Sequence, residues 1–364
     1  MPLFTPHIPD GAAQRIADTL ATRWIGQGPQ VDTFEHRFGQ RFCGDHAPLA
    51  VGSGTDALHL AYLLAGVGPG DEVVTPVFTC TAANIPLRYL GATPVFADIE
   101  PKSLNIDVSH VRGLMNDRTR AIVCVDYGGL PCDLAGLREV ADEYDVPLIE
   151  DSAQALGASF DGAPIGSIAD FTIFSFQAIK HITTGDGGLL SIRDKSLLPD
   201  ARSLRWFGIN REKEQRGVWE NDITLLGYKY QMTDIAAAMG HAGLDEFDRT
   251  LAFRRELFDR YVAGLRDVRD VEILSLPDER REHAAWLFTI AVDDRRALQQ
   301  KLFDRGIESN QVHYRNDRYS IFGQRRSNLP AMDAMEERYL VLPLHTRMSR
   351  EDVDRICATI GEGW

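Results

Sequence analysis

The stretch FTIFSFQAIKHITTGDGGLLSI, residues 171–192, places one lysine between two apolar runs. The runs on either side are near-continuous, which favours strands buried on both faces. Between them, Lys180 has no acidic residue within three positions, and Gly185, Gly187 and Gly188 permit close backbone approach. An exposed loop lysine is the ordinary interpretation of such a segment. Whether this amine reacts must therefore be judged from the residues on the neighbouring predicted strands.

Five further short runs of similar composition predict a larger sheet. Between two of them, segment 133–145 repeats Leu134, Leu137 and Val140 at helical spacing behind Asp133, which predicts a capped amphipathic helix. Alternation of such strands and helices predicts an α/β domain with a mostly parallel, seven-stranded sheet. The seven predicted strands span 48–51, 72–76, 93–97, 121–125, 146–150, 171–176 and 188–192.

The pattern changes after Thr233, where a long helical stretch begins. It is followed by two apolar strands and two helical segments, typical of a smaller α+β unit. The sequence therefore predicts a large domain over 1–245, including the N-terminal segment, and a small C-terminal domain over 246–364. The predicted C-terminal elements are strands 271–274 and 286–292 and helices 294–305 and 350–360.

Composition excludes several classes of function. The formal net charge of −14 argues against a nucleic-acid partner, because a phosphate backbone requires a basic face. The five cysteines have no metal-ligand spacing and the histidines form no HExxH pattern, so neither a metal site nor a disulfide framework is predicted. No apolar run reaches about eighteen residues and the start is not signal-like. We expect a cytoplasmic protein that contacts no membrane.

Ligands of an α/β sheet bind where its strands end, at their carboxyl termini. After the strand at 48–51, Gly52, Ser53, Gly54 and Thr55 open a helical pattern. A glycine-rich helix start offers free N–H groups and a favourable dipole to an anion such as a phosphate. An ordinary strand-to-helix turn capped by serine is the alternative.

Two consecutive carboxylates, Glu150 and Asp151, end another buried strand, and Gln154 follows. A buried acid needs a partner, for example a protonated ring nitrogen, although capping of a helix by Asp151 is the structural alternative. The helix start, the strand-end acid and Lys180 lie on successive elements of one sheet. A pyridoxal phosphate site needs these three parts: a phosphate cradle, a partner for the pyridinium nitrogen and an amine for the Schiff base.

With these motifs, the chain resembles the DegT/StrS-type nucleotide-sugar aminotransferases, which are pyridoxal-phosphate-dependent enzymes of fold type I. The resemblance implies the two-domain fold type I architecture. It rests on the order and spacing of motifs along nearly the whole chain: WIGQGPQVDTFEHRF (24–38), VGSGTDALHLAY (51–62), EDSAQALGA (150–158), FSFQAIKHITTGDGG (174–188), GYKYQMTDIAAAMG (227–240) and LPLHTRMS (342–349).

The resemblance implies roles for several residues around the cofactor ring. The resemblance implies that Lys180 forms the Schiff base, that Asp151 pairs with the pyridine nitrogen and that Gln154 lies against the ring or its 3′ oxygen. The family usually stacks an aromatic residue on the ring, but the matching position here is Cys80. Either Phe78 takes over the stacking or the stacking is weaker.

The phosphate would be held by Gly54, Thr55 and Ser175, according to the same resemblance. In this family the neighbouring subunit commonly adds an asparagine from a GYNY-like segment. Here the matching residue is Lys229, which can bind a phosphate as a point charge. The resemblance thus implies a homodimer with active sites at the interface.

The implied reaction moves the amino group of L-glutamate to a nucleotide-linked keto-sugar, releasing 2-oxoglutarate and a nucleotide amino sugar. One alternative is a sugar 3-dehydratase of the same family, whose members carry histidine in place of the lysine, and His181 is adjacent to Lys180. Another is a catalytically silent binding protein on this fold. The nucleotide and the sugar stay open, and candidates to bind them are Trp24, Arg211, His313, Tyr314 and Arg315.

Overall fold

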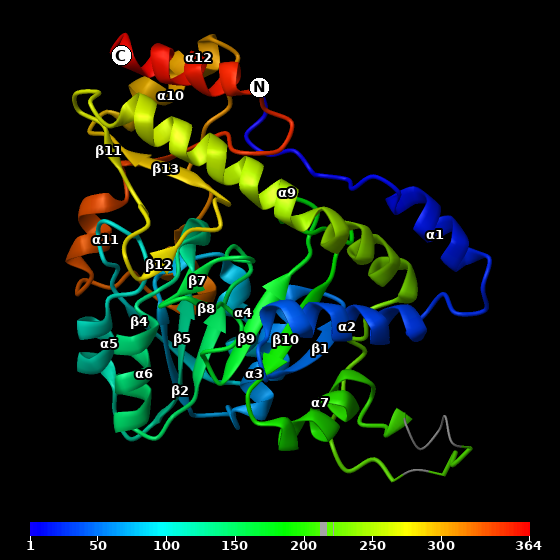
Figure 1. Cartoon of the computed structure of the whole chain (residues 1–364). Helices are drawn as coiled ribbons and strands as arrows, with labels where there is room; N and C mark the ends of the chain where they lie inside the picture. Colours follow the sequence, from blue (N-terminus) through cyan, green and yellow to red (C-terminus); the bar gives the residue numbers. More distant parts are fainter. Residues whose placement is uncertain (212–216, 221) are drawn as a thin grey trace.

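A computed structural model describes residues 1–211, 217–220 and 222–364, and it confirms the predicted α/β fold (Figure 1). The seven predicted strands form one sheet in the order β1-β10-β9-β6-β5-β2-β4. Strand β10 runs antiparallel to both neighbours, and the other paired strands are parallel. The strands are β1 (Ala47–Val51), β2 (Glu72–Pro76), β4 (Thr93–Ala97), β5 (Thr119–Val125), β6 (Leu148–Asp151), β9 (Phe171–Ser175) and β10 (Gly188–Ile192).

Helices cover both faces of this sheet, which explains why its strands are continuous apolar runs. On β10, Leu189 packs into the core beneath α2, α6 and α9 (Asp234–Leu265), whereas Leu190 packs into the core beneath α3 and α7. The helices of this part of the chain are α1 (Ala12–Leu20), α2 (Pro29–Phe42), α3 (Gly54–Leu64), α4 (Ile85–Tyr89), α5 (Val108–Leu114), α6 (Leu134–Glu143) and α7 (Leu198–Arg205).

Helix α9 (Asp234–Leu265) leads from the large sheet to a second, smaller one (Figure 1). It begins where the sequence predicts, because the Thr233 side chain accepts a hydrogen bond from the Ala236 N–H at 3.2 Å. The predicted domain boundary at 245/246 falls inside α9, and the division into two domains stays a proposal. The second sheet has the order β11-β13-β15 and contains β11 (Glu272–Ile273), β13 (Phe288–Ala291) and β15 (Tyr339–Leu342), with α10 (Arg295–Asp304) and α12 (Arg350–Gly361).

Short strand pairs bring later parts of the chain back to the large sheet. β14 (Tyr314–Arg315) pairs with β3 (Phe78–Thr79), and β12 (Arg281–Glu282) pairs with β7 (Ser159–Phe160), which also pairs with β8 (Ala163–Pro164). A short helix, α11 (Pro330–Met335), precedes β15. None of the helices in the described part of the chain combines the length and apolar character needed to cross a bilayer.

Candidate active site

The three residues predicted to hold a phosphate meet at one edge of the large sheet. Gly188, the first residue of β10, pairs with Ser175, the last residue of β9. On the other side of β10, Ser53 caps α3, whose first turn begins with Gly54 and Thr55. A Cβ atom on Gly54 would lie only 3.0 Å from the Ser175 Cβ. The α3 N-terminus therefore faces the Ser175 hydroxyl at close range, as an anion cradle requires.

Asp151, at the end of β6, and Lys180, in the loop after β9, influence each other's pKa. Asp151 is 4% exposed, and its Oδ1 accepts a hydrogen bond from the Ala153 N–H at 3.0 Å. Burial raises the pKa of Asp151 to about 6, against the opposing effects of this bond and of Lys180. Burial lowers the pKa of Lys180 to about 8, although Asp151 and Cys80 oppose this. The amine is thus available as a nucleophile near neutral pH.

Trp286 forms a platform for this amine. The Lys180 Nζ lies 3.8 Å from the centre of the indole ring, and the indole Nε1 donates a hydrogen bond to the Ile179 carbonyl at 3.2 Å. The next residue points elsewhere: the His181 Nε2 lies 2.7 Å from the Ala284 carbonyl oxygen, and burial lowers its pKa well below the ordinary value. Of these two neighbouring residues, the lysine is the one whose pKa responds to Asp151.

Gln154 is fixed from both ends. Its Oε1 accepts a hydrogen bond from the Gly128 N–H at 2.8 Å, and its Nε2 lies 3.0 Å from His313 Nε2. Burial lowers the pKa of His313 to about 3, so the ring is neutral and its Nε2 accepts from the Gln154 amide. The sequence offers no signal for this pairing, because the two residues are 159 positions apart.

Cys80 stands where the family usually has the aromatic residue that stacks on the cofactor ring, and Phe78 does not take its place. Phe78 is 1% exposed and packs against Tyr127 and Tyr339, at ring-centre distances of 5.0 and 4.9 Å. It offers no free face on which a cofactor ring could stack. Cys80 is exposed and lies close enough to Lys180 to influence its pKa.

Comparisons with known proteins identify the family of the chain. Residues 6–361 match the DegT/DnrJ/EryC1/StrS aminotransferase family. The chain belongs to this family. It is 32% identical to the spore coat polysaccharide biosynthesis protein SpsC of Bacillus subtilis (strain 168), over 99% of this chain and 96% of SpsC. It is 30% identical to the GDP-perosamine synthase of Escherichia coli O157:H7, over 100% of this chain and 98% of that enzyme.

A solved structure extends the comparison to the cofactor. The putative sugar aminotransferase Spr1654 of Streptococcus pneumoniae, in its PLP form, superposes with a TM-score of 0.93 at 31% identity, covering 100% of this chain and 98% of that one. This chain, as a member of the same family, is therefore a pyridoxal-phosphate-dependent aminotransferase. Its own residues fit the cofactor, because a helix start able to bind an anion, a buried carboxylate and an amine of lowered pKa converge. Among the described residues, no cluster of three or more potential ligands could hold a metal ion.

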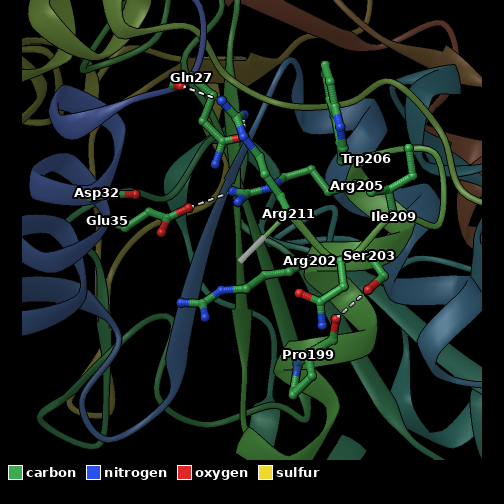
Figure 2. A pocket seen from close by; sticks show the side chains of 11 residues that line it. Gln27, Asp32, Glu35, Pro199, Arg202, Ser203, Arg205, Trp206, Ile209 and Arg211 are labelled. Atoms are coloured by element: carbon green, nitrogen blue, oxygen red, sulfur yellow. Dashed lines mark hydrogen bonds and ion pairs between the residues drawn. The ribbon is translucent and has the colours of Figure 1, made fainter. Parts of the chain in front are cut away.

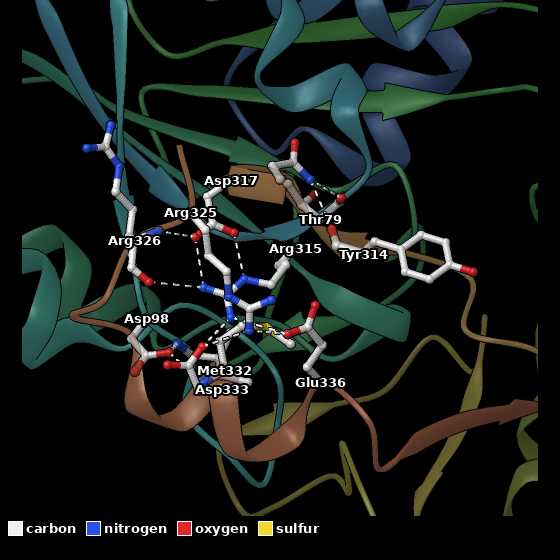
Figure 3. Close-up of polar contacts among 12 residues, drawn as sticks. Thr79, Asp98, Tyr314, Arg315, Asp317, Arg325, Arg326, Met332, Asp333 and Glu336 are labelled. Carbon is white, nitrogen blue, oxygen red and sulfur yellow. Dashed lines mark hydrogen bonds and ion pairs between the residues drawn. The ribbon is translucent and has the colours of Figure 1, made fainter. Parts of the chain in front are cut away.

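Two of the proposed sugar-binding residues of this aminotransferase lie beside β3. Arg315 is fully buried and pairs with Asp317 at 2.6 Å, with Glu336 at 3.4 Å and with Asp333 (Figure 3). Its guanidinium is held by these acids, so the structure argues against a role in binding a diphosphate. The Tyr314 ring points away from this network in Figure 3 and stays a candidate.

Arg211 lines a polar pocket of about 300 Å³ between α2 and α7 (Figure 2). Its two terminal nitrogens donate hydrogen bonds to the side chain and the backbone carbonyl of Gln27, both at 2.9 Å. Lys229 lies nearby, with its Nζ 4.7 Å from the centre of the Trp206 ring, and Trp206 also lines this pocket. Trp24 is at the surface, where Arg23 stacks on it at 5.1 Å. Within the single chain, Lys229 thus contacts an aromatic side chain of its own subunit.

Proposed function

We propose that this aminotransferase transfers the amino group of L-glutamate to a nucleotide-linked keto-sugar, giving a nucleotide amino sugar and 2-oxoglutarate. The observation that carries the proposal is a lysine of lowered pKa, Lys180, held over the Trp286 ring in the loop that leads on from Ser175 at the helix-start anion cradle. The relative named GDP-perosamine synthase supports a nucleotide-linked acceptor. The relative named for spore coat polysaccharide biosynthesis supports a role in making sugars for a polysaccharide.

Each polar residue of the site has a task in this reaction. Bound pyridoxal phosphate supplies an electron sink next to the carbon that loses its proton. Lys180 Nζ takes up that proton and returns it during the transfer, as a general base and then an acid. Asp151, once ionised, would stabilise a positive charge on the ring nitrogen of the bound cofactor. The side chain of Gln154, fixed by its bonds to Gly128 and His313, would then lie against the cofactor ring and orient it.

The cofactor phosphate would be held by the backbone of Gly54 and the hydroxyls of Thr55 and Ser175. We propose that Lys229 of a neighbouring subunit completes this phosphate site in a homodimer. Exposed apolar side chains near this segment support an association surface; Leu226 is 81% exposed. A cytoplasmic location belongs to the same proposal and is supported by the five unpaired cysteines.

Incubation with L-glutamate and a panel of UDP-, dTDP- and GDP-linked 3-keto and 4-keto sugars tests the proposal, with products read by mass spectrometry. We expect one acceptor to gain an amino group in step with 2-oxoglutarate release. Lys180→Ala should abolish both products, whereas Lys195→Ala, at an exposed position, should leave them unchanged. Loss of a sugar hydroxyl without gain of nitrogen, or full transfer by Lys180→Ala, would refute it.

A further inference from the structure

The turn that carries Trp286 to the Lys180 amine is held from behind by an arginine of α9. Arg254 is 5% exposed. Its Nε donates a hydrogen bond to the Ala285 carbonyl at 2.9 Å, and its Nη2 donates to the carbonyls of Trp286 at 2.9 Å and Leu344 at 3.0 Å. One guanidinium thus joins the Trp286 turn to the segment that follows β15.

This turn needs external support because its backbone is strained. Ala285 has φ +53°, in the left-handed region that residues with a Cβ atom avoid. Its N–H donates to His283 Nδ1 at 2.6 Å, and the Trp286 N–H donates to the Gly128 carbonyl at 3.1 Å. The Arg254 bonds hold the two carbonyls of the same turn. The position of the indole below Lys180 therefore depends on contacts from both sides.

Arg254 also places a positive charge behind the Trp286 turn, without a carboxylate partner among the described residues. Within the described part of the chain, its bonded partners are three carbonyl oxygens, and it forms no ion pair with a carboxylate. Burial lowers the pKa of Arg254 to about 10, so it stays charged at neutral pH. Its charge adds to the effect of burial in lowering the pKa of Lys180. The other titratable groups around Lys180 are Asp151 on β6, Cys80 before the turn 81–83, and the neutral histidines His181 and His313.

We propose that Arg254 is a positioning residue of the transamination: it fixes the Ala285–Trp286 turn against the Lys180 amine and supplies the positive charge behind it. The charge opposes protonation of the amine, which must be uncharged to attack a carbonyl carbon. The hydrogen bonds keep the indole in place while the amine changes its protonation state. This role concerns the amine and is independent of the sugar that accepts nitrogen.

Three variants of the full-length chain, freed of cofactor, separate charge from geometry. Arg254→Gln removes the charge, and Arg254→Lys keeps the charge without the planar fork that reaches three carbonyls. Arg260→Gln, on the same helix, removes a partly exposed pair with Asp354 and serves as the control. The first readout is acetylation of Lys180 by limiting acetic anhydride as a function of pH, measured by peptide mass spectrometry. The second is the near-ultraviolet circular dichroism of the tryptophans.

For Arg254→Gln we expect the half-maximal pH of Lys180 acetylation to rise by about half a unit or more toward the ordinary lysine value. Arg254→Lys should keep the wild-type half-maximal pH but change the tryptophan signal, and Arg260→Gln should change neither. A folded Arg254→Gln with an unshifted profile would overturn the charge role. If that variant does not fold, a shifted profile in Arg254→Lys would overturn the charge role. An unchanged tryptophan signal in Arg254→Lys would overturn the positioning role.

Discussion

Burial brings both ionisable partners of the site, Asp151 and Lys180, closer to neutrality than they would be in water. Cofactor attachment needs the uncharged Lys180 amine, which is the form above its pKa of about 8. It also needs ionised Asp151, which is the form above its pKa of about 6. The two requirements act in the same direction, because both forms become more populated as pH rises.

We therefore predict that the rate of pyridoxal phosphate uptake by the cofactor-free chain rises with pH from 6 to 8 and levels off above about 8. Between these values the rate should increase by up to about tenfold per pH unit, following the uncharged fraction of Lys180. Stopped-flow absorbance across this range measures it. A rate that stays constant or falls between pH 6 and 8 would contradict the assignment of Lys180 as the attacking amine.

The Asp151 carboxylate should be needed for activity but unfavourable for folding. Because its pKa is raised in the folded chain, the stability it contributes at low pH is lost as pH rises through about 6. Asp151→Asn should therefore lower kcat on the order of a hundredfold or more, since the ring nitrogen loses its charged partner. At pH 8 the cofactor-free variant should unfold at the same or a higher temperature than wild type.

Steady-state kinetics and thermal melts at pH 5 and pH 8 measure the two effects of Asp151→Asn. Asp259→Asn, at an exposed position of α9, is the control and should leave both unchanged. A variant that loses stability at pH 8 while keeping its activity would show that Asp151 serves the fold and not the cofactor.

At the scale of strands and helices, the apolar runs predict the existence of each strand of the large sheet but not its direction. A strand buried on both faces is apolar in either orientation, so nothing in GLLSI (188–192) indicates that β10 runs antiparallel to its neighbours. Strand β15 is missed because periodicity alone cannot tell a short apolar run in a strand from one in a buried helix. The residues proposed to hold the phosphate stand out in the sequence, because Ser175 ends β9 and Gly54 and Thr55 open the helix that follows β1.

The antiparallel direction of β10, which the sequence does not indicate, determines which residue lies against the proposed phosphate cradle. It places Gly188 against the start of α3, where a Cβ atom would contact the Ser53 carbonyl oxygen and lie 2.6 Å from the Gly54 nitrogen. Gly188→Ala should push the α3 N-terminus away from Ser175. We expect a stability loss of about 1–3 kcal/mol and at least tenfold weaker binding of pyridoxal phosphate.

Urea unfolding and absorbance titration with the cofactor measure these two losses. Gly113→Ala is the matched control, because Gly113 lies in α5 with nothing within 4 Å of the added methyl group. There the same substitution should be neutral or stabilising by about 0.5–1 kcal/mol. Equal effects of the two substitutions would contradict a tight contact between β10 and the cradle.

At the scale of the whole molecule, the site combines strand ends of the large sheet with segments that return from the C-terminal half. Trp286 and His313 meet Lys180 and Gln154 across more than a hundred positions of sequence. Such contacts depend on how β12 and β14 pair with β7 and β3, and on how α9 carries Arg254 to the Trp286 turn. A single sequence has no local pattern that encodes these contacts, so the residues proposed to hold the cofactor stand out in the sequence and those that support them do not.

Completion of the phosphate site by Lys229 of a second subunit is testable by mixing an inactive variant with one that binds the cofactor weakly. Lys180→Ala lacks the amine, and Lys229→Ala should bind pyridoxal phosphate at least tenfold more weakly because a cation near the phosphate is lost. In a mixed dimer, one site then combines an intact Lys180 from one subunit with an intact Lys229 from the other. Random exchange of equal amounts should restore about a quarter of the wild-type sites.

The mixture is assayed at a cofactor concentration that saturates wild type but not Lys229→Ala, after exchange has been followed by native mass spectrometry. The control is a mixture of Lys180→Ala with Asp151→Asn. Both residues belong to the site of the same subunit, so no site of a mixed dimer has Lys180 and Asp151 intact together. Lys229 in the single chain contacts Trp206, so a role confined to its own subunit would give no recovery in either mixture. Recovery in the first mixture alone would show that each site takes its lysines from two chains.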